Sequence, residues 1–257
     1  MIFETHAHYD DDKFNKDRDE LLGRLPKEGI GYVVDVGASI ASTKMALDLS
    51  QQYDFIYAAV GVHPSDIEDL NDETFAWLSN QTQADKVVAI GEIGLDYYWE
   101  KDPEVRDRQK YWFTKQIELA KEKNLPIIVH SREAAEDTVK VMKEANAQEV
   151  PGIIHCYSYS PELSKTFLDM GYYLGIGGVI TFKNAKKLVE TVKKAPMERL
   201  LLETDCPYLA PEPNRGKRNS SLNLIYVADK IAEIKNLTRE EVISITTDNA
   251  KKLYRIN

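Results

Sequence analysis

The amino-acid sequence predicts an α/β fold, a (β/α)8 TIM-type barrel that occupies residues 1–257 as a single domain. Short apolar runs rich in β-branched residues alternate with amphipathic, helix-like segments along the whole chain, and eight such runs are present. Most of these runs are apolar throughout, which is typical of parallel strands buried on both faces. A length of 257 residues suits one barrel of this type. An open, doubly wound sheet is the alternative.

The expected elements alternate in order from the N-terminus. The strands are expected at residues 1–6, 32–36, 55–62, 87–90, 127–130, 153–156, 172–176 and 200–203. The helices are expected at residues 17–27, 42–52, 72–81, 103–123, 133–144, 161–169, 183–194, 222–234 and 239–254. Eight parallel strands close most economically into a barrel, so the helix at 222–234 is expected to complete it and the last helix to extend the C-terminus.

Several boundaries carry their own local signals. Pro103 suits the first turn of a long helix, and Ser160 followed by Pro161 is typical of an N-cap with proline at the first helical position. Gly171 is typical of the residue that ends a helix. The least regular stretch, residues 208–220, follows the last strand and is expected to form a loop over the catalytic face.

Composition limits the classes of function. Hydrophobic residues make up 43% and charged residues 29% of the chain, a globular balance with enough material for a core. No apolar stretch reaches the length of a membrane span and no signal segment opens the chain, so a cytoplasmic protein without membrane contact or an obligate protein partner is expected. Cys156 and Cys206 are expected to be buried free thiols. The net charge of -9 argues against broad adhesion to nucleic acid, but not against a substrate held through metal ions.

Histidines are the first candidates for metal ligands. His6 and His8 are spaced i, i+2 at the end of an extended segment, so both rings project from one face of a strand and can reach one ion. The chain has only five histidines, and the other three, His63, His130 and His155, each end a short apolar run. The carboxyl ends of barrel strands meet at one mouth, so these side chains are expected to be neighbours.

Two acidic motifs complete the expected ring of ligands. Glu92 follows the fourth expected strand and Asp205 follows the eighth. Four histidines, Glu92 and Asp205 are too many ligands for one catalytic ion with an open position, and they fit two divalent ions that share a carboxylate. Glu92, between Gly91 and Gly94, is the expected bridge. Nitrogen ligands suit Zn²⁺ or Mn²⁺ and carboxylates suit Mg²⁺, so the metal identity stays open.

The motifs together resemble those of one family. They are, in chain order, THAHYD, GVHP, GEIGLDYY, PIIVHSR, IIHCYS, GIGG and ETDCPYLAP. Over nearly its whole length the chain resembles the TatD family of metal-dependent deoxyribonucleases, within the wider amidohydrolase-like metal-dependent hydrolases. The resemblance implies one metal ion held by His6, His8, Glu92 and Asp205, and a second held by Glu92, His130 and His155. It supports binuclear hydrolysis, whereas the natural substrate rests on analogy.

Further polar residues near the expected mouth are candidates for contact with substrate. Arg132 is an apt phosphate clamp because a guanidinium can bind two oxygens at once, and a solvated arginine at a helix start is the alternative. Arg215, Lys217 and Arg218 form the only basic cluster near the mouth, although such clusters are more often a solvated surface.

The roles of His63, Glu203 and the aromatic residues after Asp96 are less defined. His63 is expected to contact substrate or a third ion. Glu203 is expected to join the site behind the ligands or as an extra ligand, or else to form a buried ion pair. Residues 97–99, Tyr-Tyr-Trp, are candidates for stacking on bases, with aromatic loop packing as the alternative.

The expected function is divalent-metal-dependent hydrolysis of phosphodiester bonds, with DNA as the substrate that the resemblance implies. Single-stranded or frayed ends are favoured because two recessed ions must reach one phosphate. Glu92 and Asp205 are the expected catalytic residues, and Asp205 is expected to position or deprotonate the attacking water. Ester or amide hydrolysis, including aminoacyl-tRNA deacylation, is the alternative among enzymes. A nucleic-acid-binding or scaffold protein with a structural metal is the third hypothesis, and the intact ligand set weighs against it.

Overall fold

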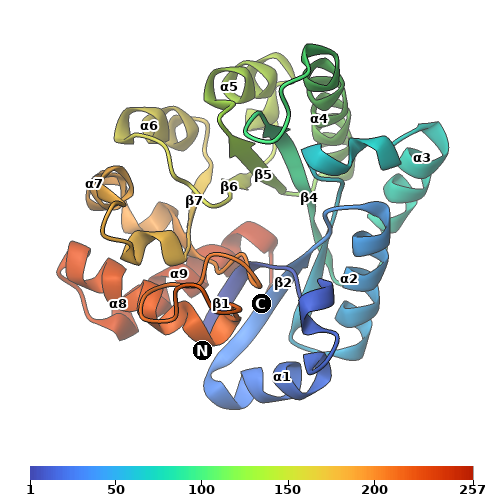
Figure 1. Cartoon of the computed structure of the whole chain (residues 1–257). Helices are drawn as coiled ribbons and strands as arrows, with labels where there is room; N and C mark the ends of the chain where they lie inside the picture. The colour runs from blue at the N-terminus through green and yellow to red at the C-terminus, as the bar shows by residue number, and fades with distance from the viewer. Residues whose placement is uncertain (257) are drawn as a thin grey trace.

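The computed structural model describes residues 1–256, and within them eight parallel strands form one sheet in sequence order, as predicted. The strands are β1 (Ile2–Ala7), β2 (Ile30–Val36), β3 (Ile56–Val60), β4 (Val87–Asp96), β5 (Ile127–Arg132), β6 (Gly152–Ile154), β7 (Tyr173–Ile176) and β8 (Leu200–Leu202). Figure 1 shows the helices arranged around these strands. The sheet curls into a (β/α)8 barrel.

The helices fall between the strands and after them, close to the predicted positions. They are α1 (Arg18–Arg24), α2 (Ile40–Gln52), α3 (Asp72–Gln81), α4 (Pro103–Lys123), α5 (Ala135–Glu144), α6 (Pro161–Asp169), α7 (Lys186–Lys194), α8 (Leu224–Lys235) and α9 (Arg239–Tyr254). The predicted bounds of α3, α4, α6 and α9 are confirmed. α1 is shorter than predicted because Pro26 lies in a 3-10 turn, Leu25–Glu28, that ends at Gly29 with a φ of 90°.

β4 is longer than the sequence predicts. The strand was expected to end at Ile90, before the glycines of its motif, yet it continues to Asp96 and pairs with β5 along the way. Gly94 has a φ of +145°, and a Cβ atom there would overlap the carbonyl oxygen of His130. Glycine therefore permits a close approach of the two strands. Consequently Glu92 lies inside β4, directly beside the end of β5.

Two sets of buried side chains alternate along the strands. The larger set lies between the sheet and the surrounding helices. The smaller set includes Phe3, Val34 and Ile128, and it packs on residues of α9. The ring of Phe3 stacks on that of Tyr254, with centroids 5.8 Å apart, and the Tyr254 hydroxyl donates to the carbonyl oxygen of Thr5 at 3.2 Å. α9 therefore closes the end of the barrel at which the strands begin, and the other end stays open.

The barrel closes where β1 meets the segment after β8. Ala7 forms an isolated parallel bridge with Cys206. The backbone amide of Asp205 donates to the carbonyl oxygen of His6 at 3.0 Å, and the amide of His8 donates to that of Cys206 at 2.8 Å. This seam joins the first strand to the chain that follows the last one.

The helices of the described chain were also compared with the dimensions of a bilayer. Within residues 1–256 no helix combines the length and the apolar character that crossing a membrane requires. The longest helix, α4, has 21 residues and includes Glu104, Arg106, Lys121 and Lys123 among its charged side chains.

Candidate metal centre

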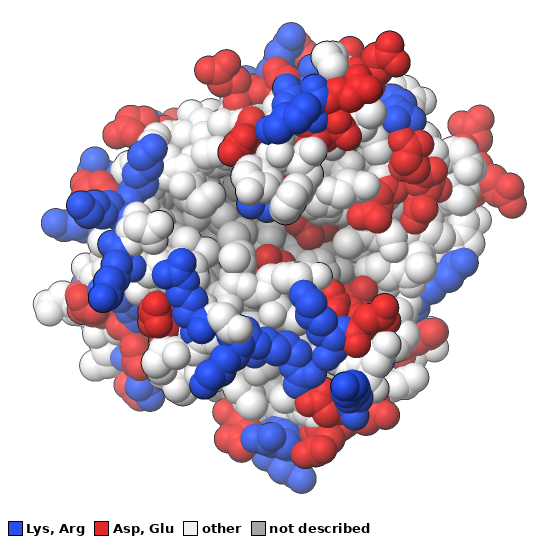
Figure 2. Space-filling model, viewed as in Figure 1, with Lys and Arg blue, Asp and Glu red and all other residues white. Residues whose placement is uncertain are grey.

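The open end of the barrel holds a cavity of about 570 Å³. Figure 2 shows this face of the molecule with a hollow at its centre, acidic side chains at the floor and many basic side chains along the lower rim. Six predicted ligands lie at or just beyond the carboxyl ends of five strands. They are His6 of β1 and His8 after it, Glu92 of β4, His130 of β5, His155 after β6 and Asp205 after β8. The fold therefore brings all six together.

Four donor atoms form one compact group. The Nε2 atoms of His6 and His8 are 3.0 Å apart, and they lie 3.3 and 3.5 Å from Oε2 of Glu92. Oδ1 of Asp205 lies 3.4 Å from Nε2 of His8 and 3.9 Å from Nε2 of His6. Four donors placed tetrahedrally about an ion at roughly 2.1 Å are about 3.4 Å apart. The group thus has the spacing that one divalent ion requires.

A second group surrounds the other carboxylate oxygen of Glu92. Nδ1 of His130 lies 2.9 Å from Oε1 of Glu92, and Nε2 of His155 lies 3.7 Å from the same atom. Nε2 of His155 is also 3.9 Å from Oδ1 of Asp205. The two oxygens of Glu92 therefore face different groups of donors, which is the arrangement expected of a bridging carboxylate.

Three of the four ligand histidines have partners that set which ring nitrogen faces the cavity. Nε2 of His130 lies 3.0 Å from Oδ2 of Asp96, and Nδ1 of His155 lies 3.1 Å from Oε1 of Glu203. Nδ1 of His8 lies 2.8 Å from the carbonyl oxygen of Val36. Such partners hold the ring and its tautomer, and they increase the basicity of the other nitrogen.

Burial and neighbouring charges shift the pKa values of these side chains in opposite directions. Burial lowers the pKa of His155, but the carboxylates of Glu203 and Glu92 outweigh it and raise the pKa to about 9. Burial raises the pKa of Glu92, but the surrounding histidines, His155 and His6 foremost, hold it well below its usual value. The pKa of Asp205 is lowered in the same way, with His8 as the strongest counterweight to burial. A metal ion would displace protons from the rings and pair with ionised carboxylates.

Glu203 is fully buried, so its carboxylate has no surface to offer a substrate. Besides its contact with His155, Oε1 accepts a hydrogen bond from the backbone amide of Cys156 at 2.6 Å. The carboxylate fits against Gly175 of β7, where a Cβ atom would overlap it. The small residue of the GIGG motif thus makes room for the acid.

His63 lies on the cavity wall with its ring oriented by the backbone. Nδ1 accepts a hydrogen bond from the amide of Ser65 at 3.1 Å, so the ring proton is assigned to Nε2. That nitrogen is 3.9 Å from Oε1 of Glu92. Burial, reinforced by His130, lowers the pKa of His63 to about 3. His63 therefore presents a neutral N–H donor to the cavity, and its lone pair faces away from the metal ligands.

The predicted substrate contacts are divided between the cavity and its surroundings. Arg132 lines the cavity, as do His63 and Trp99. Arg215, Lys217 and Arg218 are exposed but do not line it. Arg218 donates to both carboxylate oxygens of Asp17, at 2.6 and 2.5 Å. Sequence reasoning could not see this pair because its members are 201 residues apart.

Asp96 is the residue of the site to which the sequence reasoning assigned no role. Its Oδ2 contacts Nε2 of His130, and its Oδ1 accepts from the backbone amides of Tyr98 and Trp99 at 2.9 and 3.0 Å. It is 1% exposed, so both contacts are sheltered from water. Its position four residues after Glu92, on the same face of a strand, was the available signal.

Comparison with known proteins places this centre in a family. The family model described as TatD related DNase matches residues 3–255. The chain belongs to the TatD family. This TatD protein is 49% identical to the metal-dependent hydrolase YabD of Bacillus subtilis strain 168, over all of both chains. It is 34% identical to the metal-dependent hydrolase YcfH of Escherichia coli K12, over all of this chain and 97% of that one.

A solved structure supports the same assignment for the TatD protein. The crystal structure of YjjV, a TatD homologue from Escherichia coli K12, superposes with a TM-score of 0.92 at 29% identity, covering 100% of this chain and 98% of that one. Fold, family and donor groups agree, so this is a metal-dependent hydrolase with a His, Glu and Asp centre able to bind metal.

Proposed function

We propose that this TatD protein hydrolyses phosphodiester bonds of DNA with two divalent ions. One ion would be held by His6, His8, Glu92 and Asp205, and the other by Glu92, His130 and His155. The observation that carries the proposal is the division of the two Glu92 oxygens between two groups of donors. Bound ions would supply Lewis acidity toward the phosphoryl group and toward the attacking water.

The side chains of the chain supply the remaining steps. Asp205 is ionised, since its pKa is lowered, and its carboxylate accepts the proton of the attacking water. The Nε2–H of His63 donates a hydrogen bond to a phosphoryl oxygen. Arg132 binds the phosphate through its guanidinium edge. Glu203 is a positioning residue that acts through the ring of His155.

The shape of the site favours an accessible end of DNA as substrate. The ligands lie at the floor of a cavity, and four of them, His6, His8, Glu92 and His155, are no more than 8% exposed. A rigid duplex would have to bend or unpair before an internal phosphate reached that floor. Single-stranded or frayed ends meet this requirement directly.

Ester or amide hydrolysis is the second candidate, because an activated water attacks carbonyl carbon as well. Arg132 in the cavity favours the phosphodiester, since a cation stabilises a substrate that carries negative charge. An aminoacyl-tRNA deacylase would contact the phosphates of its RNA outside the reacting centre, so Arg132 alone does not exclude it. Substrate comparison decides between the two.

The test is a metal-dependent activity screen on purified protein. Chelation is expected to abolish cleavage of single-stranded DNA, and Mg²⁺, Mn²⁺ or Zn²⁺ to restore it. Asp205→Asn, purified in parallel, is the control for contaminating nucleases and is expected to be inactive. Full turnover by a rigorously metal-free sample would contradict the proposal. Hydrolysis of esters or amides with no cleavage of phosphodiesters would favour the deacylase alternative.

A further inference from the structure

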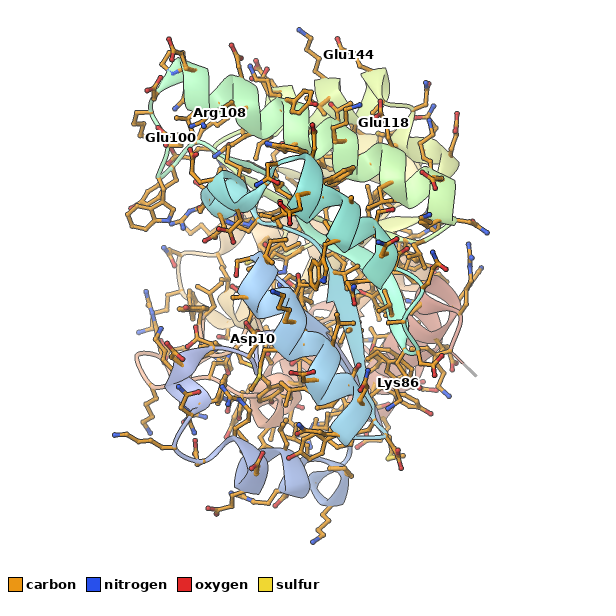
Figure 3. All side chains as sticks on the ribbon, turned by 90° about the vertical axis from the view of Figure 1, so that its right-hand side faces the viewer. Asp10, Lys86, Glu100, Arg108, Glu118 and Glu144 are labelled. Atoms are coloured by element: carbon orange, nitrogen blue, oxygen red, sulfur yellow. The ribbon has the colours of Figure 1, made fainter. Side chains whose placement is uncertain are left out.

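A short loop on the rim of the cavity exposes two aromatic side chains. It joins β4 to α4, and it presents Tyr98 with 41% and Trp99 with 69% of the residue exposed. The neighbouring Tyr97 is 9% exposed, and its hydroxyl donates to Asp137 at 2.7 Å. In the side view of Figure 3, Glu100 marks the loop at the mouth end of the barrel, and Lys86 lies toward the other end. Exposure of a large indole beside a catalytic cavity is a feature of binding surfaces.

The loop is held in place although its aromatic residues are exposed. The amides of Tyr98 and Trp99 donate to the carboxylate of Asp96. Arg106 of α4 donates to the carbonyl oxygens of Tyr97 at 3.3 Å and Glu100 at 2.8 Å. These bonds fix the backbone on both sides of the indole. Its position is therefore set before any partner binds, which reduces the entropy lost on binding.

A cation lies between this loop and the metal ligands. The guanidinium carbon of Arg132 is 3.9 Å from the centre of the Tyr98 ring and 5.6 Å from that of Trp99. Its neighbour Glu133 pairs with Lys101 instead, at 3.7 Å, and the ion pairs found among residues 1–256 do not include Arg132. A guanidinium stacked on an aromatic face keeps its N–H edge available for an anion. Arg132 also follows His130 by two residues on β5.

We propose that Trp99 and Arg132 form a nucleotide subsite on the rim. Trp99 stacks on one unpaired base of the chain being cut, and Arg132 binds the phosphate of that nucleotide. The inference rests on the proposed phosphodiesterase function and specifies its substrate class, a strand with an unpaired base next to the scissile linkage. A paired base is stacked between its neighbours and does not offer a free face to the indole.

The first test measures binding by fluorescence. The chain has three tryptophans, so the variant Trp77→Phe/Trp112→Phe leaves Trp99 as the only one. We expect a single-stranded pentanucleotide with phosphorothioate linkages, which slow cleavage, to quench the emission of the metal-loaded variant. A pentanucleotide of abasic sugars is expected to leave it unchanged. Equal quenching by both, or by neither, would overturn the subsite.

The second test separates stacking from a structural role. Trp99→Ala is expected to raise KM for a base-bearing single strand roughly 5- to 150-fold, the loss that removal of one stacked base produces. kcat and the cleavage of an abasic strand are expected to stay near wild type, and Trp99→Phe to retain most of the affinity. The matched control is Tyr111→Ala, an aromatic residue 53% exposed on α4 outside the cavity lining.

The outcomes distinguish this inference from the proposed function. If Trp99→Ala impairs base-bearing and abasic strands equally, the loop only supports the fold and the subsite is wrong. If the wild-type protein cleaves no phosphodiester, the proposed function is wrong, and the fluorescence result still decides whether Trp99 binds a base.

Discussion

Glu203 lies directly behind His155, with its Oε1 3.1 Å from Nδ1 of the ring. The pair turns Nε2 of His155 toward Glu92 and keeps that nitrogen basic. Glu203→Gln retains the shape of the side chain and removes its charge. We expect metal affinity at the His155 position to fall about 10- to 100-fold, as for other carboxylate partners of ligand histidines. Calorimetric titration with Mn²⁺ measures this, and Glu240→Gln, on the exposed side of α9, should leave the affinity unchanged.

Glu92 and His130 should differ in their effect on metal stoichiometry. Glu92→Ala removes the carboxylate that both donor groups share, so we expect neither position to fill. His130→Ala removes a ligand from one group only, so one ion should remain bound. Equilibrium dialysis followed by elemental analysis gives the number of ions per chain. Two ions bound with normal affinity by Glu92→Ala would show that Glu92 is not the bridge.

Metal affinity should depend on pH through the ligand histidines. The pKa of His155 is raised to about 9, so near neutral pH the metal-free ring carries a proton that a metal ion must displace. The proton competes more strongly as pH falls, and the apparent affinity should therefore decrease from pH 9 toward pH 6. Titration in two buffers with different ionisation enthalpies counts the protons released. A pH-independent affinity with no proton release would contradict the protonation of the ring.

Gly94 should tolerate no side chain. Gly94→Ala forces a residue with a Cβ atom into a φ of +145° and against the carbonyl oxygen of His130. We expect the free energy of unfolding to fall by about 3 kcal/mol or more. Gly23→Ala is the control, because Gly23 lies in α1 with nothing within 4 Å of the added atom. It should increase the free energy of unfolding by about 0.5–1 kcal/mol. Urea denaturation followed by circular dichroism measures both.

The form of the DNA and the salt concentration should affect cleavage in a characteristic way. Single-stranded and frayed substrates should be cut faster than closed circular duplex, because the ligands lie at the floor of a cavity. Arg218 is already paired with Asp17, so few cations are free for phosphates. The salt dependence of binding should therefore be shallow, corresponding to roughly two to four neutralised phosphates. Preference for closed circular duplex with a steep salt dependence would overturn the recessed-site interpretation.

The sequence was sufficient for the barrel and for the six ligands because both depend on local patterns. Each ligand histidine follows or ends an apolar run, and parallel strands deliver such positions to one mouth. The path of β4 through Gly91 and Gly94 was not predictable, since glycine usually interrupts a strand and its fit here depends on β5. The partners of the ligands were equally hidden. Asp96 contacts His130 across 34 residues, and Arg218 contacts Asp17 across 201.

The seam between β1 and the chain after β8 also has a mechanical meaning. Its backbone bonds join His6 and His8 to Asp205 and Cys206, so three proposed ligands of one ion lie on the two sides of the closure. A bound ion would act as a clasp between chain segments about 200 residues apart. Pulling on the two ends of the chain would load this clasp directly. The force needed to open the barrel should therefore depend on the metal that fills it and fall when the metal is removed.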